Sequence, residues 1–128
     1  MKIAVVGSRS FKGERAYDAM CSILGVCDFD EVISGGASGT DRLAERYSQE
    51  HDIPLHVFPA EWDKFQGNSA AYERNKLIVA EADAVIAFWD GKSKGTFMTM
   101  KLARDARKTL MIVRTDLLFS EEDDDAPA

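Results

Sequence analysis

Two glycine-rich segments of this chain have the composition of loops that bind anions. They are Gly35-Gly36-Ala37-Ser38-Gly39-Thr40-Asp41 and Asp90-Gly91-Lys92-Ser93-Lys94-Gly95-Thr96. Each follows a short apolar run and leads into a helical pattern, so backbone N–H groups and the positive end of a helix face one point. The first segment fits neither the dinucleotide fingerprint nor the Walker P-loop. Tight strand-to-helix packing is the alternative for it, but three glycines exceed what one turn needs. We predict that both segments hold phosphate.

A third turn, Gly7-Ser8-Arg9-Ser10, offers a planar guanidinium whose geometry suits phosphate. An ordinary strand-to-helix turn with a solvated arginine explains this segment equally well. In the first glycine-rich segment, Asp41 is expected to cap or orient the loop rather than touch phosphate, because like charges repel.

The longest irregular stretch, residues 59–68, contains Glu61, Trp62 and Asp63. A loop of this length in a compact domain is often functional. Trp62 could stack on a base, and either acid could bind a ribose hydroxyl or act as an acid/base group. An aromatic plug over the core, flanked by two solvated acids, is an equally good interpretation. Arg74, in the helical segment that follows, either reaches the site or pairs with a neighbouring glutamate.

Five short apolar runs alternate with helical patterns along the chain. Continuous runs of this kind are typical of strands covered on both faces. Ser38 and Ser69 are the expected N-caps of the second and third helices, and the fourth begins near Gly95. The alternation predicts an α/β fold, a Rossmann-like, doubly wound parallel sheet of five strands in three layers, with ligands outside the carboxyl ends of the strands. The predicted strands are Ile3–Val6, Glu31–Ser34, Leu55–Phe58, Ala84–Phe88 and Leu110–Val113.

Charge is concentrated at the end of the sequence. The 128 residues carry a net charge of −6, and the run Glu121–Asp125 contributes five of the negative charges. The rest of the chain is therefore nearly neutral. We predict one folded domain over 1–115 and a disordered acidic tail over 116–128. A nearly neutral body makes nucleic acid an unlikely partner, because duplex DNA requires a basic face.

The remaining features predict a cytoplasmic protein with no membrane segment, metal or cofactor. No apolar run approaches the roughly 20 residues that span a bilayer, and the first residues are too short for a signal peptide. Cys21 and Cys27 are expected to be reduced thiols, with no second Cys/His pair at zinc-ligand spacing.

Taken together, these motifs resemble the SLOG superfamily of Rossmann-like domains, and most closely its YspA-related branch. The resemblance covers about residues 5–113. It implies a nucleotide or nucleotide-derived ligand and, by analogy with relatives, possible homo-oligomers. The motifs that carry it are Val6-Gly7-Ser8-Arg9, Ser34 to Asp41, Pro59-Ala60-Glu61-Trp62, Arg74-Asn75, Ala87 to Gly91 and Gly95-Thr96.

The resemblance extends to the lonely-guy phosphoribohydrolases, which cleave a base from a nucleoside monophosphate. Arg74 and Asn75 occupy the place of an Arg-Lys pair in those enzymes. Their catalytic glutamate follows a Gly-Thr pair by three residues, a position held here by Thr99, which cannot act as an acid or base at neutral pH.

Three functions follow, and the first is our prediction. It is the binding or sensing of a nucleotide-like small molecule. The alternative is an N-glycosidic or phosphoribohydrolase-like hydrolase that uses Glu61 or Asp63 with Arg74. Single-stranded nucleic-acid binding, by analogy with DNA-processing protein A of the same superfamily, is the least favoured because of the neutral body. The expected ligand-binding residues are Gly7, Ser8, Arg9, Gly35, Gly36, Ala37, Ser38, Gly39, Asp41, Trp62, Arg74, Asn75, Gly95 and Thr96.

Overall fold

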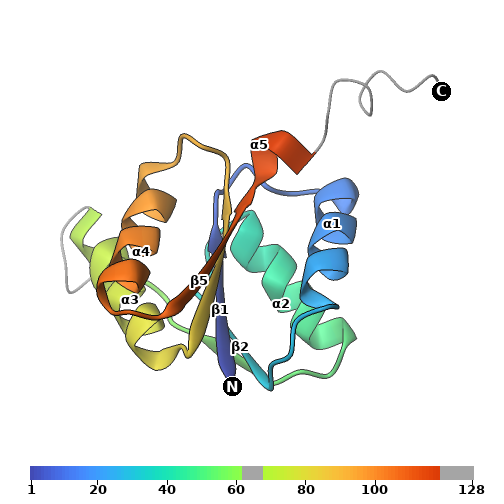
Figure 1. The fold of residues 1–128 in the computed structure, drawn as a ribbon, viewed down its shortest axis with the longest axis horizontal. Coiled ribbons are helices and arrows are strands. Elements are labelled where there is room, and N and C mark those ends of the chain that lie inside the picture. Colours follow the sequence, from blue (N-terminus) through green and yellow to red (C-terminus); the bar gives the residue numbers. More distant parts are fainter. Residues whose placement is uncertain (62–67, 119–128) are drawn as a thin grey trace.

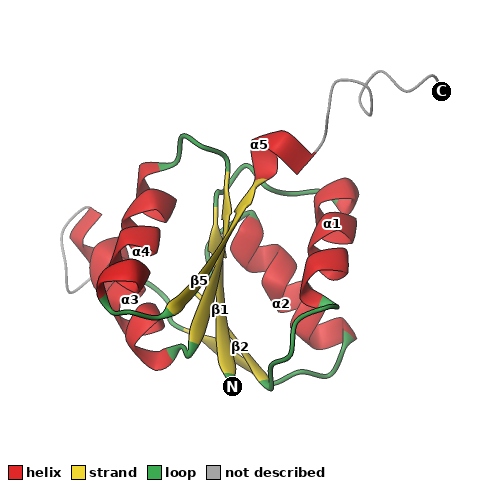
Figure 2. Ribbon diagram, in the orientation of Figure 1, coloured by secondary structure: helices red, strands yellow, loops and turns green. Residues whose placement is uncertain are grey.

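The computed structural model of the chain describes residues 1–61 and 68–118, and strands and helices alternate through them (Figures 1 and 2). The strands are β1 (Lys2–Gly7), β2 (Glu31–Ser34), β3 (Leu55–Val57), β4 (Ala84–Trp89) and β5 (Thr109–Arg114). The helices are α1 (Glu14–Leu24), α2 (Thr40–Glu50), α3 (Asn68–Glu81), α4 (Lys94–Asp105) and α5 (Thr115–Leu118).

The sheet is fully parallel, with the strand order β3-β2-β1-β4-β5. From the central β1 the chain builds outward through β2 and β3. It then crosses back, so that β4 pairs with the other side of β1 and β5 closes that edge. The direction of winding therefore reverses between β1 and β4. In doubly wound sheets this reversal opens a crevice at the carboxyl ends of the strands, where ligands bind.

Helices cover both faces of the sheet, which gives the three predicted layers. Figure 2 shows α1 and α2 on one face and α3 and α4 on the other. Side chains alternate along the buried strands, as the two-residue period of a strand requires. Val5 and Phe88 pack in the core beneath α1 and α2, while Val6 and Val85 pack in the core beneath α3 and α4. The predicted Rossmann-like fold is confirmed.

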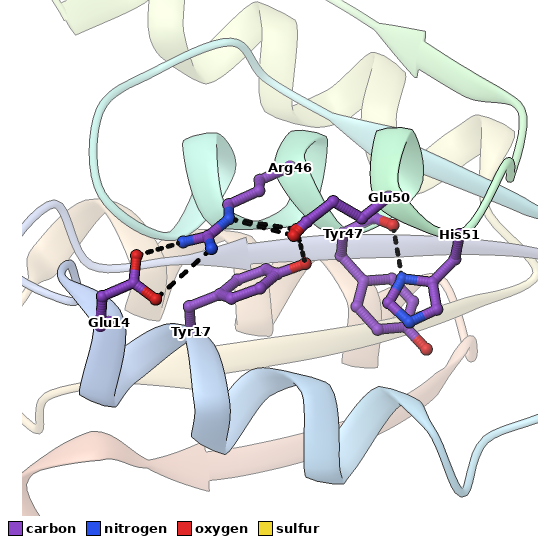
Figure 3. A network of polar contacts seen from close by, with 6 residues as sticks. All are labelled: Glu14, Tyr17, Arg46, Tyr47, Glu50 and His51. Atoms are coloured by element: carbon purple, nitrogen blue, oxygen red, sulfur yellow. Dashed lines mark hydrogen bonds and ion pairs between the residues drawn. The ribbon is translucent and has the colours of Figure 1, made fainter.

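A polar network joins α1 to α2 (Figure 3). The guanidinium of Arg46 bonds Glu14 (Nη1–Oε1 2.7 Å) and Glu50 (Nε–Oε2 3.3 Å). It also stacks on Tyr17, 3.8 Å from the ring centroid, and the Tyr17 hydroxyl donates to Glu50 at 3.1 Å. None of these residues lines either of the two cavities that the described part of the chain forms at the edge of the sheet. The network therefore holds the two helices together and is not part of a binding site.

The expected helix caps at Ser38 and Ser69 are wrong. Helix α2 begins at Thr40 after Gly39, whose φ is 74°, and no side chain caps it. Gly39 is required there because a Cβ would lie 2.4 Å from the backbone oxygen of Arg9. Ser69 lies inside α3, which begins at Asn68. A tertiary contact and an earlier helix start thus override the local capping preference.

The C-terminal part of the described chain contains a short helix, α5, that the sequence patterns did not predict. It falls at the predicted boundary between the domain over 1–115 and the tail over 116–128, and that boundary stays a prediction. Among the described residues, no helix is both long enough and apolar enough to cross a membrane.

Gly7 gives the sharpest test of the packing at the end of β1. A Cβ there would lie 2.5 Å from both the Phe88 carbonyl oxygen and the Thr40 Oγ1. We expect Gly7→Ala to lower the free energy of unfolding by about 1–3 kcal/mol, as extra atoms in a packed site do. Gly95→Ala is the matched control, because a Cβ there meets no described atom within 4 Å and alanine favours the helix. Urea denaturation measures both, and equal stabilities would contradict the packing argument.

Candidate functional site

Two adjoining cavities lie at the carboxyl edge of the sheet, beside the point where the winding reverses. The larger, of about 500 Å³, is bounded by the turn after β1, the turn after β4 and the start of α4. The second, of about 440 Å³, lies by the loops after β2 and β3. Arg9, Ala37 and Arg74 line both cavities. The two spaces therefore share one wall, and that wall carries two guanidinium groups.

Arg74 is fixed in this wall by its own hydrogen bonds. Its Nη1 donates to the Gly35 carbonyl at 2.6 Å, and its Nε donates to the Asn75 Oδ1 at 2.8 Å. Burial lowers the pKa of Arg74, and the nearby carboxylate of Asp41 opposes that shift. Arginine nevertheless stays charged in proteins. Arg9 is exposed. Within the described part of the chain, neither arginine has an ion-pair partner.

Two backbone amides of the first glycine-rich loop, those of Gly36 and Ala37, are already engaged by the protein itself. The Ala37 N–H donates to the Asp41 Oδ2 at 3.1 Å, and the Gly36 N–H donates to the Ser34 Oγ at 3.3 Å. Asp41 is 8% exposed, and burial raises its pKa, although the Ala37 hydrogen bond and the charge of Arg74 act in the opposite direction. Asp41 thus holds this loop through the Ala37 amide, and the Gly36 and Ala37 amides are not open to a phosphate.

The loop after β4 repeats this arrangement with a different carboxylate. Asp90 Oδ1 accepts from the backbone N–H of Lys92 at 2.8 Å and of Ser93 at 2.7 Å. These hydrogen bonds lower the pKa of Asp90. The Ser93 Oγ caps α4 by accepting from the Thr96 N–H at 3.4 Å. Here too a protein group occupies the place where an anion was expected, so the positive charge in the walls of the two cavities comes from Arg9 and Arg74.

Ser8 joins the turn after β1 to the turn after β4. Its N–H donates to the Phe88 carbonyl at 2.9 Å, and its Oγ accepts from the Asp90 N–H at 3.2 Å. Ser8 is buried and held by these two hydrogen bonds, which fix the backbone from which Arg9 extends.

The structure places the other predicted site residues as follows. Gly7, Asn75, Gly95 and Thr96 line the larger cavity, while Gly35, Gly36 and Ser38 line the second. Gly39 lines neither cavity. Glu61 is exposed, and Trp62 and Asp63 lie outside the described residues.

The expected ligand-binding residues did not include Asp90 and Ser93, although the segment that contains them was predicted to hold phosphate and both line the larger cavity. Their signature was nonetheless present, because an Asp-Gly turn followed by serine is typical of a loop that bonds its own amides and then caps a helix. In residues 1–61 and 68–118, no three His, Cys, Asp or Glu side chains are grouped to hold a metal ion.

Comparison with known families identifies this domain. The model of the YspA, cpYpsA-related SLOG family matches residues 1–65. The chain belongs to this family. The predicted resemblance is therefore confirmed, while self-association and cytoplasmic location stay predictions.

Two individual proteins are also similar to this SLOG chain. The Gene 61 protein of Mycobacterium phage D29 is 29% identical over 113 residues, which cover 82% of this chain and 90% of that protein. The structure of DNA processing protein A from Helicobacter pylori, described for its single-stranded DNA binding mode, matches with a TM-score of 0.60. It is 19% identical, and the match covers 100% of this chain and 74% of that chain. This likeness supports the Rossmann-like fold.

The same comparison contradicts the predictions about the ligand. We expected a small nucleotide, sensed or hydrolysed with Glu61 or Asp63, and considered nucleic acid unlikely. The similar structure instead belongs to a protein that binds single-stranded DNA. The net charge is an average over the whole chain and does not show that Arg9 and Arg74 stand together at the cavities.

The opposite pKa shifts of Asp41 and Asp90 predict opposite effects of pH. The pKa of Asp41 is raised above its usual 3.8 in the folded protein, so the folded state binds this proton more tightly than the unfolded state does. The stability that this proton contributes is therefore lost as the pH rises from about 3.8 through the raised pKa. The pKa of Asp90 is lowered, so its ionisation adds stability that is lost as pH falls below 3.8. We therefore expect Asp41→Asn to gain stability relative to the parent as pH rises to 7, and Asp90→Asn to lose it. Chemical denaturation between pH 3 and 7 measures both, and parallel profiles would contradict the assignment.

Proposed function

We propose that this domain binds single-stranded nucleic acid along the carboxyl edge of its sheet, with Arg9 and Arg74 contacting the phosphate backbone. The observation that carries the proposal is the shared wall of the two cavities, where neither guanidinium forms an ion pair among the described residues, although the Asp41 carboxylate lies near Arg74. A guanidinium is suited to phosphate because its planar donors match two phosphate oxygens. The similarity to DNA processing protein A, which binds single-stranded DNA, supports the same class of ligand.

The division of the site into two spaces favours a strand over a mononucleotide. The two cavities have volumes of about 500 and 440 Å³, and each volume lies within the range found for sites that bind one small molecule. One nucleotide would occupy one cavity and leave the other empty. A strand places one nucleotide in each, and its backbone crosses the wall where the two arginines stand.

The same features favour single strands over duplexes. A duplex keeps its bases stacked and paired, so it cannot place adjacent nucleotides in separate cavities. Duplex binding also depends on many phosphate contacts along a basic face, and here two arginines stand in an otherwise nearly neutral body. Unpaired strands need fewer charges, because their bases contribute contacts of their own.

We expect oligodeoxythymidine of about ten nucleotides to bind, with an affinity that depends weakly on salt. Two phosphate contacts to a single strand predict a slope of about −1.4 for log K against log salt concentration. Arg9→Ala is expected to weaken binding about tenfold and to reduce the slope by about 0.7. Fluorescence anisotropy at several salt concentrations measures both quantities. Arg74→Lys tests the second contact while keeping a positive charge in the wall.

Arg104→Ala is the matched control. Arg104 is also exposed, but it lies in the last turn of α4, at the opposite edge of the sheet. Its removal lowers the net charge equally and should leave affinity and slope nearly unchanged. The proposal fails if no single-stranded oligonucleotide binds, or if the Arg9 and Arg104 variants behave alike.

A further inference from the structure

An aromatic pair lies beside the larger cavity, on the side toward β5. Phe97, in the first turn of α4, is 48% exposed, and its ring lies 5.7 Å from that of Trp89, centroid to centroid. The adjacent Thr96 lines the cavity itself. Figure 1 shows that α4 begins at the end of the sheet where β5 runs into α5, which is the carboxyl edge. The exposed phenylalanine ring therefore lies at the same edge of the sheet as the proposed strand-binding groove, one residue along α4 from the cavity lining.

The ring of Trp89 is held rigidly behind Phe97. Its Nε1 donates to the Ser93 carbonyl at 3.0 Å. The Arg114 guanidinium carbon lies 5.3 Å from a Trp89 ring centroid, within the range of a cation–π contact. Two hydrogen bonds to Asp116, at 2.9 and 2.6 Å, fix Arg114 in turn. The aromatic surface is thus ordered before any ligand arrives, which limits the entropy that binding would cost.

We propose that Phe97, backed by Trp89 and Arg114, is a stacking site for one nucleobase of the bound strand. This inference rests on the proposed function and extends it along the edge of the sheet. The strand order places the features in a row, with the second cavity at β2 and β3, the larger cavity at β1 and β4, and the ring pair at β4 and β5. A strand that crosses the arginine wall reaches Phe97 by continuing in the same direction.

The chemistry of the surroundings favours a nucleobase as the group that covers the ring. Lys92 and Lys94 are exposed in the loop and at the start of α4 that lead to Phe97, so positive charge accompanies the aromatic surface. Aromatic rings beside cations are the usual arrangement of single-strand binding sites, because bases stack on the rings and phosphates bind the cations. Stacking also tolerates any base, since every base has a π-face.

A double-mutant cycle between protein and ligand tests the stacking site. We expect Phe97→Ala to weaken binding of a ten-nucleotide thymidine strand about tenfold, within the range for loss of one base–aromatic stack. Unlike Arg9→Ala, it should leave the salt slope unchanged, because the lost contact carries no charge. An abasic position scanned along the strand should reproduce the loss at one or two positions. With an abasic site at one of those positions, Phe97→Ala should cause no further loss of affinity.

Two further variants separate stacking from general apolar contact. Phe97→Trp keeps an aromatic face and should retain affinity. Met98→Ala is the matched control, because Met98 is 40% exposed on the same turn of α4 but takes no part in the ring contact. Its affinity should match that of the parent.

The outcomes distinguish failure of this inference from failure of the proposed function. If no oligonucleotide binds, both are wrong. If binding depends on Arg9 but Phe97→Ala does not change the affinity, only the stacking site is wrong. The same holds if the loss of affinity caused by Phe97→Ala adds in full to the loss caused by an abasic site at every position. Sedimentation velocity checks the remaining possibility. A parent dimer that Phe97→Ala converts to monomer, with affinity unchanged, would assign the ring to a contact between copies and overturn the inference.

Discussion

The turn after β1 is clamped between its two neighbours by backbone contacts, and the position of Arg9 depends on this clamp. On one side, the Ser8 carbonyl accepts from both the Thr40 N–H at 3.3 Å and the Thr40 Oγ1 at 2.9 Å. On the other, the Ser8 N–H donates to the Phe88 carbonyl at 2.9 Å. Glycines at positions 7 and 39 permit this approach, since a Cβ at either would come within about 2.5 Å of the facing atoms. Three loops are thereby held at one edge as a single rigid unit.

The two loops on either side of this turn carry built-in anions. Asp41 and Asp90 accept the amide hydrogen bonds that a phosphate would otherwise take. Internal carboxylates make the loops rigid without a ligand, and they leave recognition to side chains instead of to the backbone. The opposite pKa shifts of the two acids follow from their settings, because Asp41 is buried whereas Asp90 is open to water and bonded to two N–H groups.

The sequence predicted the fold well because strands covered on both faces, such as β1 and β4, leave continuous apolar runs ended by glycine or polar residues. For the same reason it predicted that the glycine-rich loops meet at one edge of the sheet, since parallel strands bring their following loops together. The cap at Ser38 was mispredicted because capping preference is local, whereas Gly39 is dictated by contact with Arg9. The occupied amides also escaped prediction, because composition alone does not show whether a loop amide bonds its own protein or a ligand.

Net charge is a poor guide to the ligand for a related physical reason. At physiological ionic strength, charges separated by more than about 8 Å are largely screened, so a ligand responds to the charges beside it and not to the total. Arg9 and Arg74 therefore act directly on a ligand in the cavities, while Asp41 and Asp90, which also line the larger cavity, are held by hydrogen bonds from loop amides. A site with so few cations cannot derive high affinity from counterion release alone. The remaining binding free energy has to come from surfaces that contact the bases. The rigidity of the cavities and of the aromatic pair is therefore as important as the charge.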